Sequence, residues 1–289
     1  MEKAAGMIEI HIATLLFGFA GLFGKLVTAP APVIVFGRTF FAFVVLSGII
    51  GVLKKDFRPR SFRDLAAFFL LGAVLAGHWI AFFHAIQVST VAVGLFAFSV
   101  FPLFVTFMEP VFFKENLRRI DILTAVMVVA GLWCILPNLD PANRITQGVA
   151  WGVIAGISFA VLSILNRRYA PTYSPLVIAG YQNGVAAVCL VPVCAFMDFS
   201  LTLKEGILLA VLGIFCTAFA HALFIRSLRF IKTQLAGVIT GLEPVYGAIF
   251  AFLILGERPG IRTLVGGTLI VGAVMIGTLL RASSPSHGT

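Results

Sequence analysis

A small number of charged and aromatic side chains lie inside segments of this chain that are otherwise strongly apolar. The residues that could do chemistry there include Arg38, His78, His221 and Glu243. If such segments cross a membrane, a charge at the centre of the bilayer costs about 2.5–3.5 kcal/mol on insertion scales. Side chains of this kind therefore normally face protein or water, which makes these four candidates for an internal site.

One group of candidates lies within about one turn of a helix that is predicted near residues 65–86. His78 and Phe82 have the i, i+4 spacing that puts two side chains on one helix face, with Trp79 beside them. A flat aromatic molecule could stack on Trp79 or Phe82 while His78 forms a hydrogen bond with its polar end. In the alternative interpretation, Trp79 packs against a neighbouring helix and His78 binds a backbone carbonyl. The complete set of predicted substrate-binding residues is His78, Trp79, Phe82, Phe17, Phe98, Ser158, His221 and Tyr246.

Two charged residues are candidates for contact with a charged group of the substrate or for coupling to an ion. Arg38 could bind a carboxylate, or it could extend to the outer interface or pair with a helix end. Glu243 could carry a proton or bind an ammonium group, or its carboxyl could be satisfied by Asn, Gln or Ser in a tight helix pair. Pro244 has no N–H and frees a carbonyl one turn earlier. Pro102 and Pro244 are predicted to bend their helices and to act as hinges.

Other kinds of chemistry are excluded by motifs that the sequence lacks. It has no Walker sequence, so ATP does not drive it, and neither Gly-x-Ser-x-Gly nor His-Glu-x-x-His occurs. The net charge of +9 is attributed to basic loops at a membrane surface, so no nucleic-acid partner is expected. The cysteines lie in apolar segments without the spacing of metal ligands, so no metal or other cofactor is expected at Cys134, Cys189, Cys194 or Cys216.

The elements that position these residues are ten long apolar stretches. Hydrophobic residues make up 60% of the chain, charged residues 11%, and the mean hydropathy is +1.06. Crossing about 30 Å of hydrocarbon takes about 20 residues at a rise of 1.5 Å each, and lipid leaves the backbone no water to bind. The sequence therefore predicts an all-α polytopic membrane protein with ten transmembrane helices, near residues 8–28, 33–53, 65–86, 90–113, 120–137, 147–166, 175–197, 205–226, 234–255 and 261–280.

Basic residues are unevenly distributed between the two sides of this predicted bundle. One side carries 15 Lys and Arg residues and the other carries 5. Because cytoplasmic loops are enriched in Lys and Arg, both termini are predicted to be cytoplasmic, and the even number of spans agrees. The predicted location is the bacterial inner membrane, with lipid covering the apolar surface.

The two halves of the chain are related by an offset of 142 residues. Pro102 aligns with Pro244 and Glu115 with Glu257, while Trp79 aligns with His221. Near the other end of each half, Gly6, Ile12, Ala13 and Phe17 align with Gly148, Ile154, Ala155 and Phe159. Five spans is an odd number, so residues 147–280 are predicted to form an inverted copy of residues 1–137. Inverted repeats are typical of transporters that alternate access to a site near the midplane.

A proline followed thirteen residues later by a glutamate closes the fourth helix of each half. This pattern, Pro102 to Glu115 and Pro244 to Glu257, resembles the signature of the EamA type of the drug/metabolite transporter superfamily. The second copy is the cleaner match, because Lys114 replaces the glycine that precedes the first glutamate. The two glutamates are predicted to act as helix caps or loop locks. The 29 phenylalanines and the segment 77–80 resemble YddG-type aromatic amino-acid exporters.

The resemblance implies a secondary transporter rather than an enzyme. We expect it to export amino acids, of the aromatic or large apolar kind, or related small metabolites across the inner membrane by alternating access. The alternative is a passive facilitator or channel for small metabolites. A membrane-embedded enzyme would need a cluster of acids or histidines, whereas His78, His84, Glu109 and His221 are scattered. The oligomeric state is not predicted.

Overall fold

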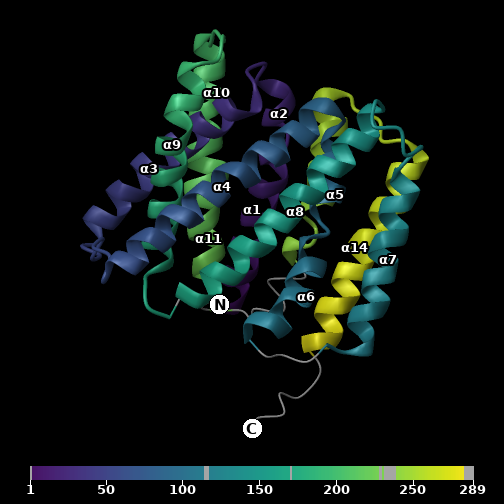
Figure 1. The fold of residues 1–289 in the computed structure, drawn as a ribbon, viewed down its shortest axis with the longest axis horizontal. Helices are drawn as coiled ribbons and strands as arrows, with labels where there is room; N and C mark the ends of the chain where they lie inside the picture. The colour runs from purple at the N-terminus through teal and green to yellow at the C-terminus, as the bar shows by residue number, and fades with distance from the viewer. Residues whose placement is uncertain (1, 114–116, 170, 228–229, 231–238, 283–289) are drawn as a thin grey trace.

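A computed structural model describes residues 2–113, 117–169, 171–227, 230 and 239–282. In these residues every regular element is a helix, and no strand is formed. The elements shown in Figure 1 are α1 (Glu2–Ala20), α2 (Phe23–Leu26), α3 (Ala31–Val52), α4 (Phe62–Val88), α5 (Val91–Phe98), α6 (Phe101–Phe113), α7 (Arg119–Ile135), α8 (Arg144–Tyr169), α9 (Pro175–Ala195), α10 (Leu203–Gly213), the π-helix η1 (Ile214–Phe219), α11 (Ala220–Ser227), α13 (Glu243–Phe250), the π-helix η2 (Ala251–Leu255) and α14 (Ile261–Ala282).

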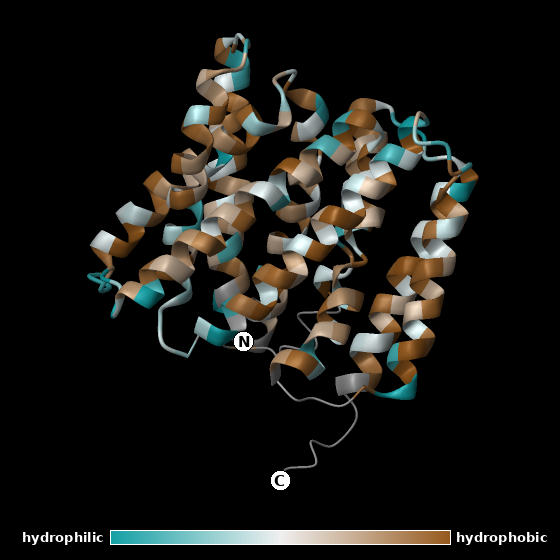
Figure 2. Ribbon diagram, viewed as in Figure 1, coloured by the Kyte–Doolittle hydropathy of each residue, from teal (hydrophilic) through white to brown (hydrophobic). Residues whose placement is uncertain are grey.

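Eight helical segments of the described chain are long and apolar enough to cross a membrane. The predicted fifth span is α7, which has 17 residues. The predicted ninth span, 234–255, begins with residues 234–238, which lie outside the described residues, and most of its described part is the shorter apolar helix Glu243–Leu255. In Figure 2 the hydrophobic colour follows the bodies of the helices and the hydrophilic colour gathers near their ends. The multi-pass, all-helical class is therefore confirmed, while the count of ten stays a prediction.

Several helices begin at side-chain caps that the sequence supplies. Ser61 accepts a hydrogen bond from the backbone of the first turn of α4, and Thr90 does the same for α5. Thr202 and Glu205 form a reciprocal capping box at the start of α10. The other carboxylate oxygen of Glu205 accepts hydrogen bonds from the amide and the hydroxyl of Thr28, at 3.0 and 2.6 Å. This carboxylate thus joins α10 to the connection before α3.

The helix contacts follow the 142-residue offset. Under this offset α1 corresponds to α8, α3 to α9, α4 to α10–α11, α6 to α13–η2, and α7 to α14. The counterpart of α5, residues 233–240, lies mostly outside the described residues. The packing of α1 on α11 corresponds to that of α8 on α4, and the packing of α1 on α13 corresponds to that of α8 on α6. The pairs α3–α9 and α7–α14 correspond to themselves. Two halves related by a pseudo-two-fold axis would produce this pattern, although the bounds and inversion of the halves stay predictions.

The two prolines predicted to bend their helices stand instead at the start of new helices. After α5 a turn at residues 99–100 precedes α6, in which Pro102 is the second residue. A turn at residues 241–242 likewise precedes α13, in which Pro244 is the second residue. Proline is tolerated in a first helical turn, because the N–H that it lacks would have no helical partner there. The predicted bends are therefore breaks, and the hinge role stays a prediction.

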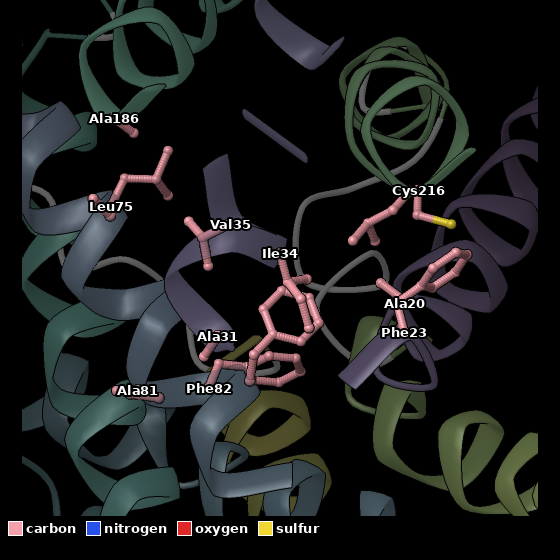
Figure 3. Close-up of a cluster of buried hydrophobic side chains, with 14 of the residues drawn as sticks. Ala20, Phe23, Ala31, Ile34, Val35, Leu75, Ala81, Phe82, Ala186 and Cys216 are labelled. Atoms are coloured by element: carbon pink, nitrogen blue, oxygen red, sulfur yellow. The ribbon is translucent and has the colours of Figure 1, made fainter. Parts of the chain in front are cut away.

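The largest cluster of buried apolar side chains joins both halves of the chain. It includes Ile34 of α3, Phe82 of α4 and Phe23 of α2 from the first half. Cys216 of η1 and Leu162 of α8 belong to it as well. Figure 3 shows part of this cluster. The candidate site lies against this core, so its side chains are held by contacts from several helices.

Candidate functional site

Arg38 is a fully buried cation whose guanidinium lies against an aromatic ring. The side chain of this α3 residue is 0% exposed, and its Cζ atom lies 3.3 Å from the centroid of the Trp79 ring and 5.9 Å from that of Phe83. Its Nε, Nη1 and Nη2 atoms have no hydrogen-bond partner among the described residues. The predicted extension of Arg38 to the membrane interface is therefore wrong, and the guanidinium pairs with no helix end among the residues that the structure describes.

His78 is also buried, and only one of its ring nitrogens is bonded. The Nδ1 atom lies 2.9 Å from the carbonyl oxygen of Ala155 on α8, and 3.4 Å from the hydroxyl of Ser158. Because a carbonyl oxygen can only accept, Nδ1 is the donor. The expected bond to a backbone carbonyl is thus present. The Nε2 atom has no partner in the part of the chain that the structure describes, so the ring keeps one polar atom for another group.

Aromatic rings surround His78 on three helices. Its centroid lies 4.8 Å from that of Trp79, 5.5 Å from that of Phe98 and 5.1 Å from that of Phe159. Phe82 lies 5.4 Å from Phe98. Five of the predicted binding residues thus lie close together, namely His78, Trp79, Phe82, Phe98 and Ser158. Phe159 was missed by sequence reasoning, although the offset pairs it with the predicted residue Phe17.

A smaller group lies between α1 and helices of the second half of the chain. The rings of Phe17 and His221 lie 5.2 Å apart, and His221 Nδ1 lies 2.8 Å from the carbonyl oxygen of Thr217 in η1. Tyr246 is placed differently, with its hydroxyl 3.3 Å from Nδ1 of His11 on α1. π-Helical turns are frequent at functional sites, and η1 positions both Thr217 and the start of α11.

The charge of Arg38 connects the two groups. It acts electrostatically on His78 in the first half, and on His221 and the half-buried Glu243 in the second. Cys216 of η1 is another electrostatic neighbour of the guanidinium. Arg38, predicted to contact a charged group of the substrate, thus lies directly against the predicted aromatic residue Trp79.

The described cavities lie beside this cluster rather than within it. One of about 310 Å³ lies between α6, α7 and α14 and includes Pro102 and Glu109 in its lining. Others of about 420 and 520 Å³ border α7 with α14 and α13 with α14. None of these three cavities is lined by the predicted binding residues His78, Trp79, Phe82, His221 or Tyr246. Packed aromatic rings occupy the place around His78, which is 0% exposed.

Polar contacts join the connections at the upper end of the bundle in Figure 1. Lys25 donates to the carbonyl oxygens of Gln87 and Ser89, at 3.2 and 2.8 Å. Glu257 accepts a hydrogen bond of 2.9 Å from the amide of Val91, the first residue of α5. Burial raises the pKa of Glu257 above its usual 4.5, while the Val91 bond opposes this shift. Glu257 acts as the predicted cap, whereas its counterpart at position 115 lies outside the described residues.

At the other end of the bundle an ion pair joins α1 to α11. The Arg226 Nη2 atom lies 2.6 Å from Oε1 of Glu9, and the side chains are 64% and 8% exposed respectively. The 142-residue offset relates these positions to His84 and Trp151, whose rings lie 5.0 Å apart. An ion pair thus joins α1 to α11, whereas an aromatic contact joins the corresponding pair, α8 and α4.

The model of the EamA-like transporter family matches residues 4–136 and again residues 146–279. The chain belongs to the EamA-like transporter family. The expected resemblance to this family is confirmed, and the two matches begin 142 residues apart. The protein is thus a membrane transporter, and the family consists of transporters rather than enzymes.

Relatives of known name extend over different shares of the chain. An uncharacterized transporter, YxxF, of Bacillus subtilis is 23% identical over 100% of this chain and 94% of its own length. An S-adenosylmethionine uptake transporter of Rickettsia bellii is 28% identical over 84% of this chain and 81% of its own. The threonine/homoserine exporter RhtA of Salmonella typhimurium is 29% identical over 58% of each. One crystal structure, 20% identical, shares the fold with a TM-score of 0.67 over 97% of this chain and 99% of its own.

Proposed function

We propose that this protein is a secondary transporter that exports amino acids, or related small metabolites, across the bacterial inner membrane by alternating access. The observation that carries the proposal is the cluster around Arg38. It combines a buried cation, a histidine with one nitrogen that no described residue bonds, and several aromatic rings inside an apolar bundle. Ligand sites in proteins combine apolar walls with a few polar groups in this way.

The named relatives support an amino-acid-like substrate. Threonine and homoserine are amino acids, and S-adenosylmethionine carries an α-amino-acid group at one end. The rings around His78 would suit a large apolar or aromatic side chain. We propose that His78, Trp79, Phe82, Phe98 and Ser158 form one wall of the site. Phe17, His221 and Tyr246 would join it from the opposite side when the bundle rearranges.

The broken helices support a mechanism in which the halves move. In transporters with inverted repeats, interrupted helices border the site, and one repeat rocks against the other. Here α5–α6 and α13 restart at Pro102 and Pro244, which we propose as hinges. Glu9–Arg226 would close one end of the path and His84–Trp151 the other.

The distribution of basic loops supports cytoplasmic termini. The start of α1 and the end of α14 lie toward the same end of the bundle in Figure 1. That end also carries the connection that follows α3, with Lys54, Lys55, Arg58 and Arg60. Labelling of a single cysteine introduced at residue 56, with an impermeant reagent on intact cells, is expected to fail until the membrane is opened.

Counterflow in liposomes tests the transport proposal directly. The purified protein would be reconstituted, loaded with unlabelled phenylalanine or threonine, and supplied with the radiolabelled form outside. A carrier that alternates its access shows transient accumulation of label, because unlabelled substrate returns the site to the outside. Equilibration without this overshoot would support a passive facilitator, and no uptake of any amino acid or S-adenosylmethionine would contradict the proposal.

A further inference from the structure

We propose that the Arg38 guanidinium binds the carboxylate of the transported molecule, and that it thereby restricts transport to substrates that carry one. This inference rests on the transport function proposed above and specifies its substrate class. It assigns selectivity to one residue of α3 and predicts a particular set of rejected molecules, namely amides and amines of the same size and shape.

The first step is the absence of a partner. Arg38 is 0% exposed, and its three nitrogens make no hydrogen bond with the described residues. A guanidinium has five N–H donors and keeps its charge in proteins. Leaving such a group buried without acceptors is among the most unfavourable arrangements in a folded protein. An anion that enters the site would remove this penalty, whereas a neutral molecule would remove only part of it.

The second step is the geometry of the Trp79 contact. Trp79 covers the face of the guanidinium, with Cζ 3.3 Å from the ring centroid. The five N–H bonds of a guanidinium lie in its plane and point outward from its edge. A ring on the face therefore leaves every donor available. Two parallel N–H bonds match the two oxygens of a carboxylate, so Trp79 holds the group while its edge stays free for a bidentate ligand.

The third step distinguishes a carboxylate from a phosphate. Arg38 is the only Lys or Arg of the sequence that lies deep inside an apolar segment. Glu243 acts on it electrostatically from the first turn of α13, without a hydrogen bond to it. A dianion would face one positive group and a nearby carboxyl. A molecule with a carboxylate at Arg38 and an ammonium toward Glu243 matches both charges, which favours an α-amino acid.

The experiment compares three probes of similar shape in the reconstituted protein. L-Phenylalanine, phenylalaninamide and phenethylamine would compete for counterflow of radiolabelled phenylalanine. In the wild type the acid should compete about 10- to 100-fold better than the other two, which is the loss expected when a charge-assisted hydrogen-bonded pair is removed. In Arg38→Gln this ratio should fall close to one. In Arg38→Lys, which keeps the charge but lacks the two parallel N–H donors of the guanidinium, this ratio should fall to an intermediate value.

A second measurement is independent of transport. Without ligand, Arg38→Gln should melt at a higher temperature than the wild type, because the substitution removes an unpaired buried charge. L-Phenylalanine, compared with an equal concentration of phenylalaninamide, should raise the melting temperature of the wild type and not that of Arg38→Gln. The matched control is Arg144→Gln, since Arg144 is exposed and bonds the carbonyl of Val88. It should keep the ligand response.

The outcomes separate the two proposals. Counterflow in which the acid and its amide compete equally would overturn the role of Arg38 and leave the transporter standing. A lower melting temperature for Arg38→Gln would also overturn it, because that result makes Arg38 a structural residue. If no label is taken up, the transport function fails. A carboxylate-dependent rise in melting temperature that disappears in Arg38→Gln would then still support an anion site.

Discussion

The ion pair between Glu9 and Arg226 predicts that two substitutions of similar size will have unequal effects. Arg226 donates from Nε and Nη2 to a single oxygen of Glu9, at 2.9 and 2.6 Å. Only 8% of the glutamate side chain is exposed, whereas 64% of the arginine is. The other carboxylate oxygen, Oε2, is buried without a partner among the described residues. The arginine therefore stabilises a carboxylate that has little access to water, while the arginine itself is well solvated.

The magnitudes follow from what each substitution leaves behind. Arg226→Gln leaves a buried carboxylate without its partner, which costs about 1–3 kcal/mol. Glu9→Gln leaves an exposed guanidinium that water can solvate, so its cost should stay below about 1 kcal/mol. The double variant should be more stable than Arg226→Gln alone, because the carboxylate is then gone as well. For a chain of this size, each kcal/mol corresponds to roughly 2 °C or slightly more in melting temperature.

Thermal unfolding of the four proteins in one detergent and one salt concentration measures the cycle. We expect the melting temperatures in the order wild type, Glu9→Gln, double variant and Arg226→Gln, with the middle two close together. Added salt should reduce the effect of Arg226→Gln only in part, because the carboxylate is shielded from water. Equal losses for the two single variants, or a larger loss for Glu9→Gln, would refute the reasoning from burial.

Three further predictions concern the site, the packing and the pH dependence. Trp79→Ala should reduce counterflow of aromatic substrates more than that of small ones, because it removes ring contact; an equal loss at normal protein levels would assign Trp79 to folding or gating. Gly131→Ala places a methyl group 2.7 Å from a carbonyl oxygen of α14 and should cost about 1–3 kcal/mol of unfolding free energy, whereas Gly272→Ala, with open space around it, should not destabilise. The raised pKa of Glu257 adds stability below pH 4.5 that is lost as the pH rises through that raised value. The melting temperature of the wild type should therefore fall as the pH rises from below 4.5 through the raised pKa. It should not show this fall in Glu257→Gln, whose amide oxygen can still accept a hydrogen bond from Val91.

The sequence predicted the class of fold because lipid imposes strict requirements on a chain. A segment of about 20 apolar residues has few stable forms in a bilayer other than a helix. The bounds were less accurate, and α4 extends over Phe62–Val88 rather than 65–86. The breaks before Pro102 and Pro244 were predicted as bends. The sequence shows where a backbone donor is missing, but the turn that follows depends on how the restarted helix packs.

The site was predicted in its residue types and only partly in its contacts. His78 was expected either to face a ligand or to bind a carbonyl, and the structure shows one nitrogen bound and the other without a partner among the described residues. Trp79 was expected either to stack on a ligand or to pack against a neighbouring helix, and its ring lies against the guanidinium of Arg38 on α3. Such pairings join different helices, so neither spacing nor hydropathy along one segment reveals them.

The offset between the halves explains why the site has a direction. The position equivalent to Arg38 is Gly180 on α9, where an added Cβ atom would lie 3.1 Å from Ile50 and from Phe57. The position equivalent to Trp79 is His221. The second half therefore contributes neither a second guanidinium nor a second indole at the related place. A pair of identical halves would bind a ligand equally well in two opposite orientations, whereas a single cation fixes the end at which a carboxylate lies. If substrate binds as proposed, the repeat supplies the movement and the differences between its copies supply the selectivity.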